Sequence, residues 1–326
     1  MNDLKHKILD VVNDDLEAIE TALKQNLNPY LDIVSETAGH ILFSGGKRLR
    51  PLIMVLSARI CGYSGNYDKT FSAMFEYLHA ATLLHDDLVD EAKLRRGKPV
   101  AHSIWGNSIA VLVGDFLLAR ALSIAVETGR NEVISIIAEV TEHMSQGEIH
   151  QLVRRGQLDL AEEEYMMIIQ NKTALLFQGG CRVSAIIADA AAKEEKAISD
   201  YGYNLGIAFQ MADDLLDYTS DTGSLGKEVG ADLKEGKLTL PVIYSLEKAG
   251  LEDRARMEMI IKNKEFSVHD FKILIELLKK HEGLKYTEKQ AEKYIAEAKK
   301  ALMVFEPSET RETLLNIADY VLARKV

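Results

Sequence analysis

Apolar residues recur at intervals of three and four along most of the chain. One such series begins at Leu4 and Ile8 and continues through Leu16, Ile19 and Leu23. Further series occupy residues 133–140 and 273–278. This spacing places apolar side chains on one face of a helix, because a helix has about 3.6 residues per turn. The sequence has no long stretch of alternating apolar and polar residues, so we predict an all-α fold.

Turn-forming residues divide the chain into helical segments without a long linker. Proline is scarce, at 5 of 326 residues, and glycine marks most of the expected breaks. We expect these breaks at residues 44–46, 62–66, 96–99, 156–160, 221–230 and 236–241. No shift in composition marks a second unit, so residues 1–326 are predicted to form a single domain.

Composition and charge narrow the possible function classes. The chain is 47% hydrophobic, which favours a folded globular protein over a disordered one. Its 39 basic and 50 acidic residues give a formal charge of 39 − 50 = −11. This acidity disfavours a nucleic-acid partner, because phosphate binding requires a basic face. It also raises the question of whether some carboxylates hold a metal ion.

Other sequence features favour a cytoplasmic protein. Cys61 and Cys181 are far apart in the sequence and suggest neither a disulfide framework nor a zinc site. The N-terminal residues mix charged and apolar side chains and do not resemble a signal peptide. The most apolar stretch, Ile109–Val126, contains Asp115 and Arg120, so we expect a buried core helix rather than a membrane span.

The strongest chemical signal is an Asp-Asp-x-x-Asp pattern that occurs twice. The first copy contains Asp86, Asp87 and Asp90, and the second contains Asp213, Asp214 and Asp217. Residues four apart on a helix lie on the same face, so the first and last aspartates of each copy should point the same way. Neighbouring carboxylates repel one another and need a compensating positive charge. Two such clusters favour Mg²⁺ over a merely solvated acidic face.

Basic residues follow both clusters. Arg95 and Arg96 come after the first cluster and Lys227 comes after the second. Other cations lie in the glycine-flanked segments 45–51 and 236–237, and Lys172 precedes an apolar helical run. Arginine forks and lysine ammonium groups bind phosphate oxygens well. Metal-binding carboxylates together with these cations indicate chemistry on a diphosphate, while no P-loop motif is present.

These motifs resemble the trans-isoprenyl diphosphate synthases, or polyprenyl synthetases, over nearly the whole chain. The resemblance rests on GGKRLRP at 45–51, EYLHAATLLHDDLVDEAKLRRGKP at 76–99 and NKTALLF at 171–177. It continues from GIAFQMADDLLD through GKEVGADLKEGKLTLPVI. The family implies the isoprenoid synthase fold, with antiparallel helices around a deep central cavity and usually a homodimer. It also implies head-to-tail condensation of isopentenyl diphosphate with an allylic prenyl diphosphate.

The resemblance also implies roles for individual residues. All six aspartates of the clusters would bind Mg²⁺, with about three ions present alongside substrate. Asp86, Asp87, Asp90, Lys172, Asp213 and Asp214 would be catalytic. The allylic diphosphate would contact Arg95, Lys172, Thr173, Gln210, Lys227 and Lys237. The isopentenyl diphosphate would contact Lys47, Arg50, His79 and Arg96, although a lone histidine on a helix is more often a core residue.

The expected mechanism needs no protein nucleophile. Mg²⁺ and cationic side chains would stabilise the departing diphosphate, which lets the allylic carbon–oxygen bond ionise. The isopentenyl double bond would attack the carbocation, and the released diphosphate would then accept a proton. A cavity that excludes water would protect the cation.

Residues before the first cluster indicate the product length. Phe75, Leu78, Ala81 and Thr82 precede Asp86 on its helix and would line a tunnel for the growing chain. In the family, bulky aromatic residues four or five positions before this aspartate stop elongation early. Here those positions are Thr82 and Ala81, which favours a long, octaprenyl-like product for quinone side chains. Phe75, about 16 Å further along, either limits the tunnel or packs in the core.

Two alternatives within this family stay open, and one outside it is disfavoured. A short-chain farnesyl or geranylgeranyl diphosphate synthase would share both clusters. A non-catalytic subunit of a heteromeric synthase would usually lack some cluster aspartates, whereas all six are present here. A terpene cyclase would normally carry a different second motif. Any membrane contact is expected to be peripheral, during release of a long lipid product.

Overall fold

The computed structural model describes residues 2–46, 48–65, 67–219, 230–263 and 265–323. In chain order its helices are α1 (Asn2–Leu27), α2 (Asp32–Leu42), α3 (Leu49–Ile60), α4 (Asp68–Val89), α5 (Ala101–Trp105), α6 (Asn107–Glu127), α7 (Asn131–Arg154), α8 (Glu162–Ile169), η1 (Gln170–Ala174), α9 (Leu175–Ile187), α10 (Ala192–Thr219), α11 (Ala231–Lys234), α12 (Leu240–Lys248), α13 (Leu251–Lys262), α14 (Val268–Lys280), α15 (Gly283–Ala301), η2 (Leu302–Val304) and α16 (Glu309–Ala323). The predicted all-α class is confirmed.

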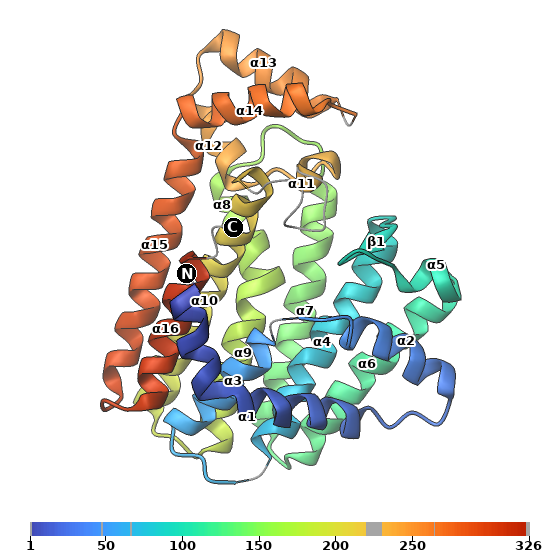
Figure 1. Ribbon diagram of the computed structural model, residues 1–326, viewed down its shortest axis with the longest axis vertical. Helices are drawn as coiled ribbons and strands as arrows, with labels where there is room; N and C mark the ends of the chain where they lie inside the picture. Colours follow the sequence, from blue (N-terminus) through green and yellow to red (C-terminus); the bar gives the residue numbers. More distant parts are fainter. Residues whose placement is uncertain (1, 47, 66, 220–229, 264, 324–326) are drawn as a thin grey trace.

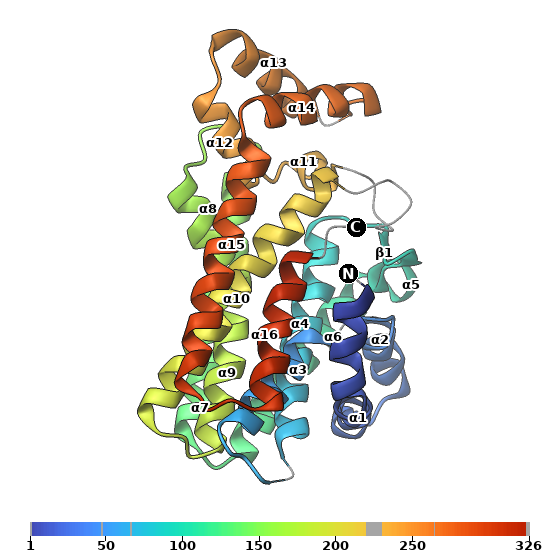
Figure 2. The same ribbon diagram turned by 60° about the vertical axis from the view of Figure 1, so that its left-hand side comes forward.

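Long helices α4, α7, α9, α10, α15 and α16 form an upright bundle, and α13 and α14 lie across one end of it (Figures 1 and 2). The described strands form one small hairpin, β1 (Leu94–Arg95) and β2 (Lys98–Pro99), which pair antiparallel. Its two-residue turn, Arg96 and Gly97, has φ of 52° and 74°. Positive φ at both turn positions suits the natural twist of a tight hairpin. The hairpin thereby folds the chain back after α4, so that Arg95 lies against the end of that helix.

Apolar helix faces meet in two hydrophobic clusters. The larger gathers α1, α3, α4, α6, α7, α9 and α16, and the smaller gathers α8 and the helices from α11 to α14. Helix α10 contributes to both, with Leu205 in the larger and Met211 in the smaller. In α1 it is Val12, not the adjacent Val11, that lies in the core. The single domain over residues 1–326 stays a prediction.

The segment containing Lys172 and Thr173 is wider than an α-helix. The apolar run predicted there is helical, but η1 forms a π-helical turn between α8 and α9. Gly206 of α10 and Gly147 of α7 approach this turn so closely that a Cβ would lie 2.6 Å from Ala174 Cα or 2.9 Å from the Lys172 amide nitrogen. Such turns occur often at functional sites. Here the glycines let two neighbouring helices press against it.

Two expectations need correction. Pro241 lies within the first turn of α12, where its missing N–H does no harm, so the break ends before it. Helix α6 is a core helix on one face only. Ala110, Val113 and Leu117 are buried against α4, whereas Leu112 on the other side is exposed. By length and composition alone α6 would also suffice to cross a membrane.

Candidate active site at the converging helix ends

Both aspartate clusters lie at the C-terminal ends of their helices, α4 and α10. The carbonyl end of a helix carries partial negative charge, so carboxylates there are repelled by the helix as well as by one another. The clusters therefore do not lie at the start of the helices that carry them. The end of α4 receives cations from elsewhere in the fold, namely from the residue after α7, the η1 turn and the loop after α11.

Asp90 lies between two cations. One carboxylate oxygen is ion-paired with Arg155, at the end of α7, and the other is 2.9 Å from the Lys237 Nζ. Burial by itself would raise the pKa of Asp90. The charges and hydrogen bonds of Lys237 and Arg155 outweigh this effect and hold the pKa below its ordinary value. Asp90 is therefore a carboxylate kept ionised by its neighbours.

Asp86 is less well compensated. Its carboxylate lies 3.9 Å from the Lys172 Nζ, which also donates to the Gln151 Oε1 at 2.9 Å and is ion-paired with Glu148. Burial is the largest influence and raises the pKa of Asp86 to about 6, with Glu148 and Asp90 adding to it and Lys172 opposing it. The site thus has an excess of negative charge around Asp86.

Asp87 points to a different partner from the other two members of its cluster. Both of its oxygens accept from the Arg95 Nε, at 2.8 and 2.9 Å, and the carboxylate is buried. The paired carboxylate and guanidinium fix the β1–β2 hairpin against the end of α4. In the structure, Asp87 therefore holds Arg95, and the metal-binding role expected for it stays untested.

The second cluster is similarly divided. The buried Asp214 accepts from the Tyr165 hydroxyl at 2.6 Å and from the Gln210 Nε2 at 2.8 Å, and Gln210 accepts from the Thr173 hydroxyl at 2.9 Å. Burial, followed by the nearby charge of Asp232, raises the pKa of Asp214 to about 8 despite these hydrogen bonds. This network connects Thr173 and Gln210, as expected of neighbouring site residues.

Asp217 and Asp213 differ in their surroundings. Asp217 is buried and accepts from the backbone N–H groups of Ala231 and Asp232, at 3.2 and 3.3 Å, at the start of α11. It thereby fixes the short helix that leads to Lys237. Asp213 is exposed at the surface of α10. Of the second cluster, Asp213 is therefore the member most accessible to an ion from solvent.

The donor set fits a hard divalent cation. Among the described residues, no three carboxylate, imidazole or thiol groups come together in a closed cage. Mg²⁺, however, commonly takes one or two protein carboxylates and completes its shell with water and phosphate oxygens. Asp86 and Asp90 on one helix end and Asp213 on another provide this kind of open site.

A second group of cations surrounds His79. Burial, followed by the charges of Arg50, Arg95 and Arg96, lowers the pKa of His79 well below its ordinary value, so the imidazole stays neutral. The Arg50 guanidinium lies 5.0 Å from the Phe177 ring centre. Several arginines so close together favour an anionic ligand. Arg50, His79 and Arg96, expected at one diphosphate site, are thus neighbours, while Lys47 and Lys227 lie outside the described residues.

Arg48 has a structural role that the sequence did not reveal. Its backbone is left-handed, with φ of 47°, and its buried guanidinium pairs with Glu20 at 2.5 Å and Glu76 at 2.7 Å. It also donates to the Leu42 carbonyl at 2.5 Å. Arg48 therefore anchors the loop before α3, and its fork is fully engaged within the protein.

Four residues of the site were missed by sequence reasoning. Glu148 and Gln151 lie three apart on one side of α7, Arg155 directly follows the last residue of that helix, and Tyr165 belongs to α8. The spacing of three was a usable signal, because it places polar side chains together on one helix face. Tyr165 had no such signal, since its partner Asp214 is 49 residues away.

The residues expected to line a tunnel lie along α4. Phe75, Leu78 and Ala81 are buried, whereas Thr82 is half-buried and donates to the His79 carbonyl. The Phe75 ring lies beside α9, where a Cβ at Gly179 would come within 3.3 Å of it. Their role in limiting product length stays a prediction.

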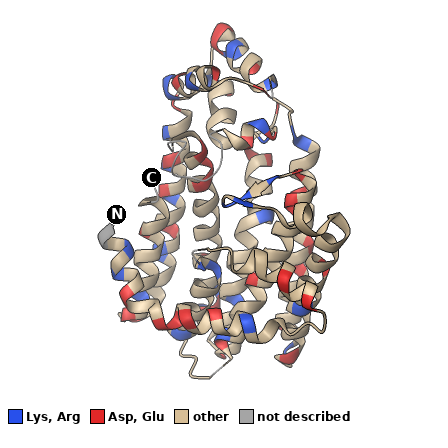
Figure 3. Cartoon of the chain, turned by 45° about the vertical axis from the view of Figure 1, so that its right-hand side comes forward, with Lys and Arg blue, Asp and Glu red and all other residues tan. Residues whose placement is uncertain are grey.

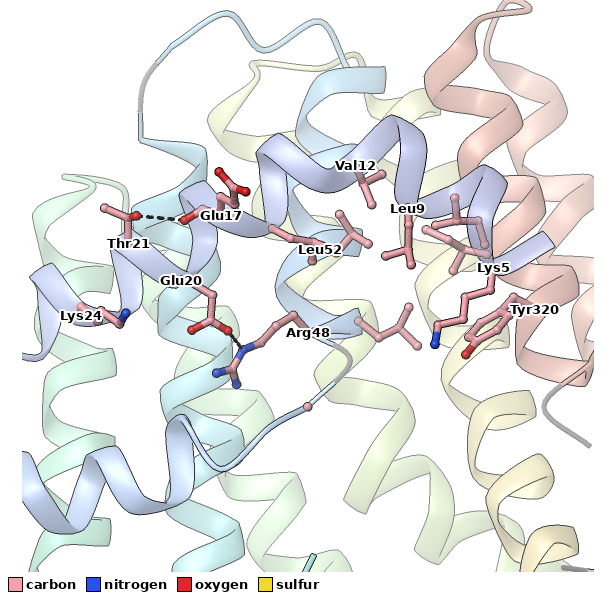
Figure 4. A pocket seen from close by; sticks show the side chains of 15 residues that line it. Lys5, Leu9, Val12, Glu17, Glu20, Thr21, Lys24, Arg48, Leu52 and Tyr320 are labelled. Carbon is pink, nitrogen blue, oxygen red and sulfur yellow. Dashed lines mark hydrogen bonds and ion pairs between the residues drawn. The ribbon is translucent and has the colours of Figure 1, made fainter. Parts of the chain in front are cut away.

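A separate hollow of about 680 Å³ lies between α1, α3 and α16 (Figure 4). Leucine, isoleucine and valine side chains form much of its lining, and Arg48 points from one wall toward Glu20. Its lining contains no member of either aspartate cluster. The hollow therefore borders the loop before α3 but is distinct from the candidate active site.

The Asp87–Arg95 pair gives a testable prediction for stability. We expect Arg95→Gln to lower the free energy of unfolding by about 2–3 kcal/mol, because it leaves the buried Asp87 carboxylate without its cation. Combining it with Asp87→Asn should recover much of this loss, as for coupled neighbours. Urea unfolding curves measure both, with Arg96→Gln as the control because Arg96 is exposed. Equal losses for Arg95→Gln and Arg96→Gln would contradict the assignment.

Known proteins resemble this chain over most of its length. A family model described as "Polyprenyl synthetase" matches residues 31–278. Octaprenyl diphosphate synthase from Escherichia coli (strain K12) is 38% identical over 318 residues, which cover 98% of each chain.

Two solved structures also match nearly the full chain. Polyprenyl synthase from Caulobacter crescentus CB15, complexed with calcium and isoprenyl diphosphate, has a TM-score of 0.92 and 38% identity, with 98% of each chain covered. Geranylgeranyl pyrophosphate synthetase from Pyrococcus horikoshii Ot3 has a TM-score of 0.91 and 30% identity, covering 98% of this chain and 99% of that one. The fold, the paired aspartate clusters and these matches together show that the chain belongs to the polyprenyl synthetase family and is a prenyltransferase.

Proposed function

We propose that this prenyltransferase is a Mg²⁺-dependent synthase of long-chain, all-trans polyprenyl diphosphates. It would add isopentenyl diphosphate head-to-tail onto an allylic prenyl diphosphate. The main support is the meeting of carboxylates from α4 with cations from α7, η1 and the loop after α11 at one end of the bundle. The calcium and isoprenyl diphosphate in the related Caulobacter structure support the choice of a divalent cation and substrate class.

Different residues of the chain would bind the allylic diphosphate and the isopentenyl diphosphate. Lys172 and Lys237, beside Asp86 and Asp90, would bind the allylic diphosphate, and Thr173 and Gln210 would extend this wall toward Asp214. Mg²⁺, held by cluster carboxylates, supplies charge that stabilises the leaving diphosphate. Fixed cations act strongly on a developing charge, because they need no reorganisation during the reaction.

The isopentenyl diphosphate would bind the arginine group. Arg50 and Arg96 carry the charge, and the neutral His79 offers a hydrogen bond without adding repulsion. The buried α4 side chains that precede Asp86 would exclude water from the site. Water would otherwise quench the carbocation. The proton lost in the last step would be accepted by the released inorganic diphosphate.

Turnover by the purified chain tests the function. With labelled isopentenyl diphosphate and farnesyl diphosphate, we expect products only when Mg²⁺ is present, and EDTA should abolish them. The same assay tests whether the chain is a non-catalytic subunit of a heteromeric synthase. Absence of product from the single chain at saturating Mg²⁺ would contradict the proposal and favour that alternative.

The small residues before Asp86 support a long product. Octaprenyl and geranylgeranyl synthases are both among the similar proteins, so similarity alone does not choose between long and short chains. Ala81 and Thr82 are small, whereas an aromatic ring at either position would occupy more of the space beside α4. We therefore favour an octaprenyl-like product over a farnesyl or geranylgeranyl one.

The predicted chain-length change is measured by chromatography of the dephosphorylated products. Thr82→Phe should shift them to shorter lengths, because a ring four residues before Asp86 would fill the proposed tunnel. Thr82→Val, which keeps the size of the side chain, should leave them unchanged. An unaltered distribution of product lengths for Thr82→Phe would contradict the assignment of Thr82 to a tunnel for the growing chain.

We also propose that the enzyme is a homodimer joined through the outer faces of α6 and α7. Leu112, Val126, Ile149 and Val153 are 59% to 64% exposed there, although they are apolar. Exposed apolar groups of this kind on adjacent helices are typical of a protein interface. A second copy would bury them, as expected for homodimers.

Light scattering coupled to gel filtration tests this interface. Leu112→Glu should yield a monomer, because it places a charge among apolar side chains that the dimer would bury. Leu251→Glu, at an exposed position of α13, should leave the dimer intact. A monomeric parent protein, or a dimer of the Leu112 variant, would contradict the proposal.

We infer a cytoplasmic location with at most peripheral membrane contact during product release. Acidic and basic residues are interspersed along the helices, as Figure 3 shows. Both cysteines are free thiols, and burial raises the pKa of each to about 12. Such inert thiols suit a reducing compartment.

A further inference from the structure

Arg155 is a cation of the site that neither the aspartate motifs nor the glycine-flanked loops predicted. It follows the last residue of α7, and its guanidinium is ion-paired with one oxygen of Asp90. Lys237 binds the other oxygen at 2.9 Å. Both oxygens of Asp90 are therefore taken by internal cations, so an added metal ion and Arg155 compete for the same carboxylate.

The position of Arg155 is fixed by two glycines. The Gly156 N–H donates to the Gly236 carbonyl at 2.8 Å, which joins the end of α7 to the loop carrying Lys237. A Cβ at Gly236 would lie only 2.9 Å from the Arg155 Cγ. The arginine stem thus packs directly on the Gly236 backbone. This arrangement brings Arg155 and Lys237 to the same carboxylate from two segments of the chain.

The guanidinium of Arg155 is not saturated by these contacts. Its Nε is buried and has no hydrogen-bond partner among the described residues. A buried donor without a partner is unfavourable, so an acceptor that reaches it would be bound strongly. Arginine forks bind the oxygens of a phosphate through two parallel hydrogen bonds. The side chain is 25% exposed, which leaves the group accessible.

We propose that Arg155 is a further diphosphate-binding residue that also serves as a temporary partner of Asp90. Without ligands, Arg155 neutralises Asp90 at the helix end. When substrate binds, Arg155 releases Asp90 to the divalent cation and turns its guanidinium to the diphosphate. This inference rests on the proposed function, and it gives Arg155 opposite effects on the two ligands.

Equilibrium binding tests both effects without turnover. In isothermal titration calorimetry, Arg155→Gln should bind Mg²⁺ alone a few-fold more tightly, because a competing cation is gone. At saturating Mg²⁺ it should bind inorganic diphosphate roughly 10-fold more weakly, because a charge-assisted fork is lost. Thermal unfolding confirms that each variant is folded.

Two further variants complete the design. Arg154→Gln is the matched control, because Arg154 pairs with Asp159 and Glu164 rather than with either aspartate cluster. It should leave both affinities unchanged. Arg155→Lys keeps the charge but loses the fork, so Mg²⁺ affinity should match the parent while diphosphate binding weakens a few-fold. If Arg155→Gln does not fold, the diphosphate affinity of Arg155→Lys still tests the inference.

The outcomes separate this inference from the proposed function. Weaker Mg²⁺ binding by Arg155→Gln would show that Arg155 merely orients Asp90, and unchanged diphosphate binding would show that it does not contact substrate. Either result overturns the inference while leaving prenyl transfer intact. A parent protein that binds both ligands but forms no product would instead overturn the proposed function.

Discussion

Negative charge at the carbonyl ends of α4 and α10 is the constraint on which the rest of the site depends. Aspartates placed there oppose the helix dipole and repel one another, so the helix ends are stable only with cations nearby. Lys172, Lys237 and Arg155 meet this need for the first cluster. The same unfavourable placement makes the site receptive to a divalent cation and, through the surrounding basic groups, to a diphosphate.

The fold brings these cations together by close backbone contact. Gly147 and Gly206 let α7 and α10 press against the η1 turn, which carries Lys172 and Thr173. Gly156 joins the end of α7 to the loop that carries Lys237. Loops of a few residues therefore suffice to position charged groups that lie far apart in the sequence.

Sequence reasoning predicted the helices and both aspartate clusters, because period and spacing are local properties. It also predicted that Arg95, Lys172 and Lys237 would belong to the site. It did not distinguish the members within a cluster. Asp87 binds Arg95 and Asp217 caps α11, and these partners depend on how the hairpin and α11 pack rather than on the motif.

The sequence by itself determined the all-α class, the chemical type of the site and the family resemblance. Each follows from residue types at fixed short spacings, which a helix converts directly into shared faces. Only the tertiary structure decided that Arg48 anchors a loop, that Tyr165 binds Asp214 and that Arg155 pairs with Asp90. These are contacts between segments that lie far apart in the sequence, and no local pattern specifies which side chains meet in the folded protein.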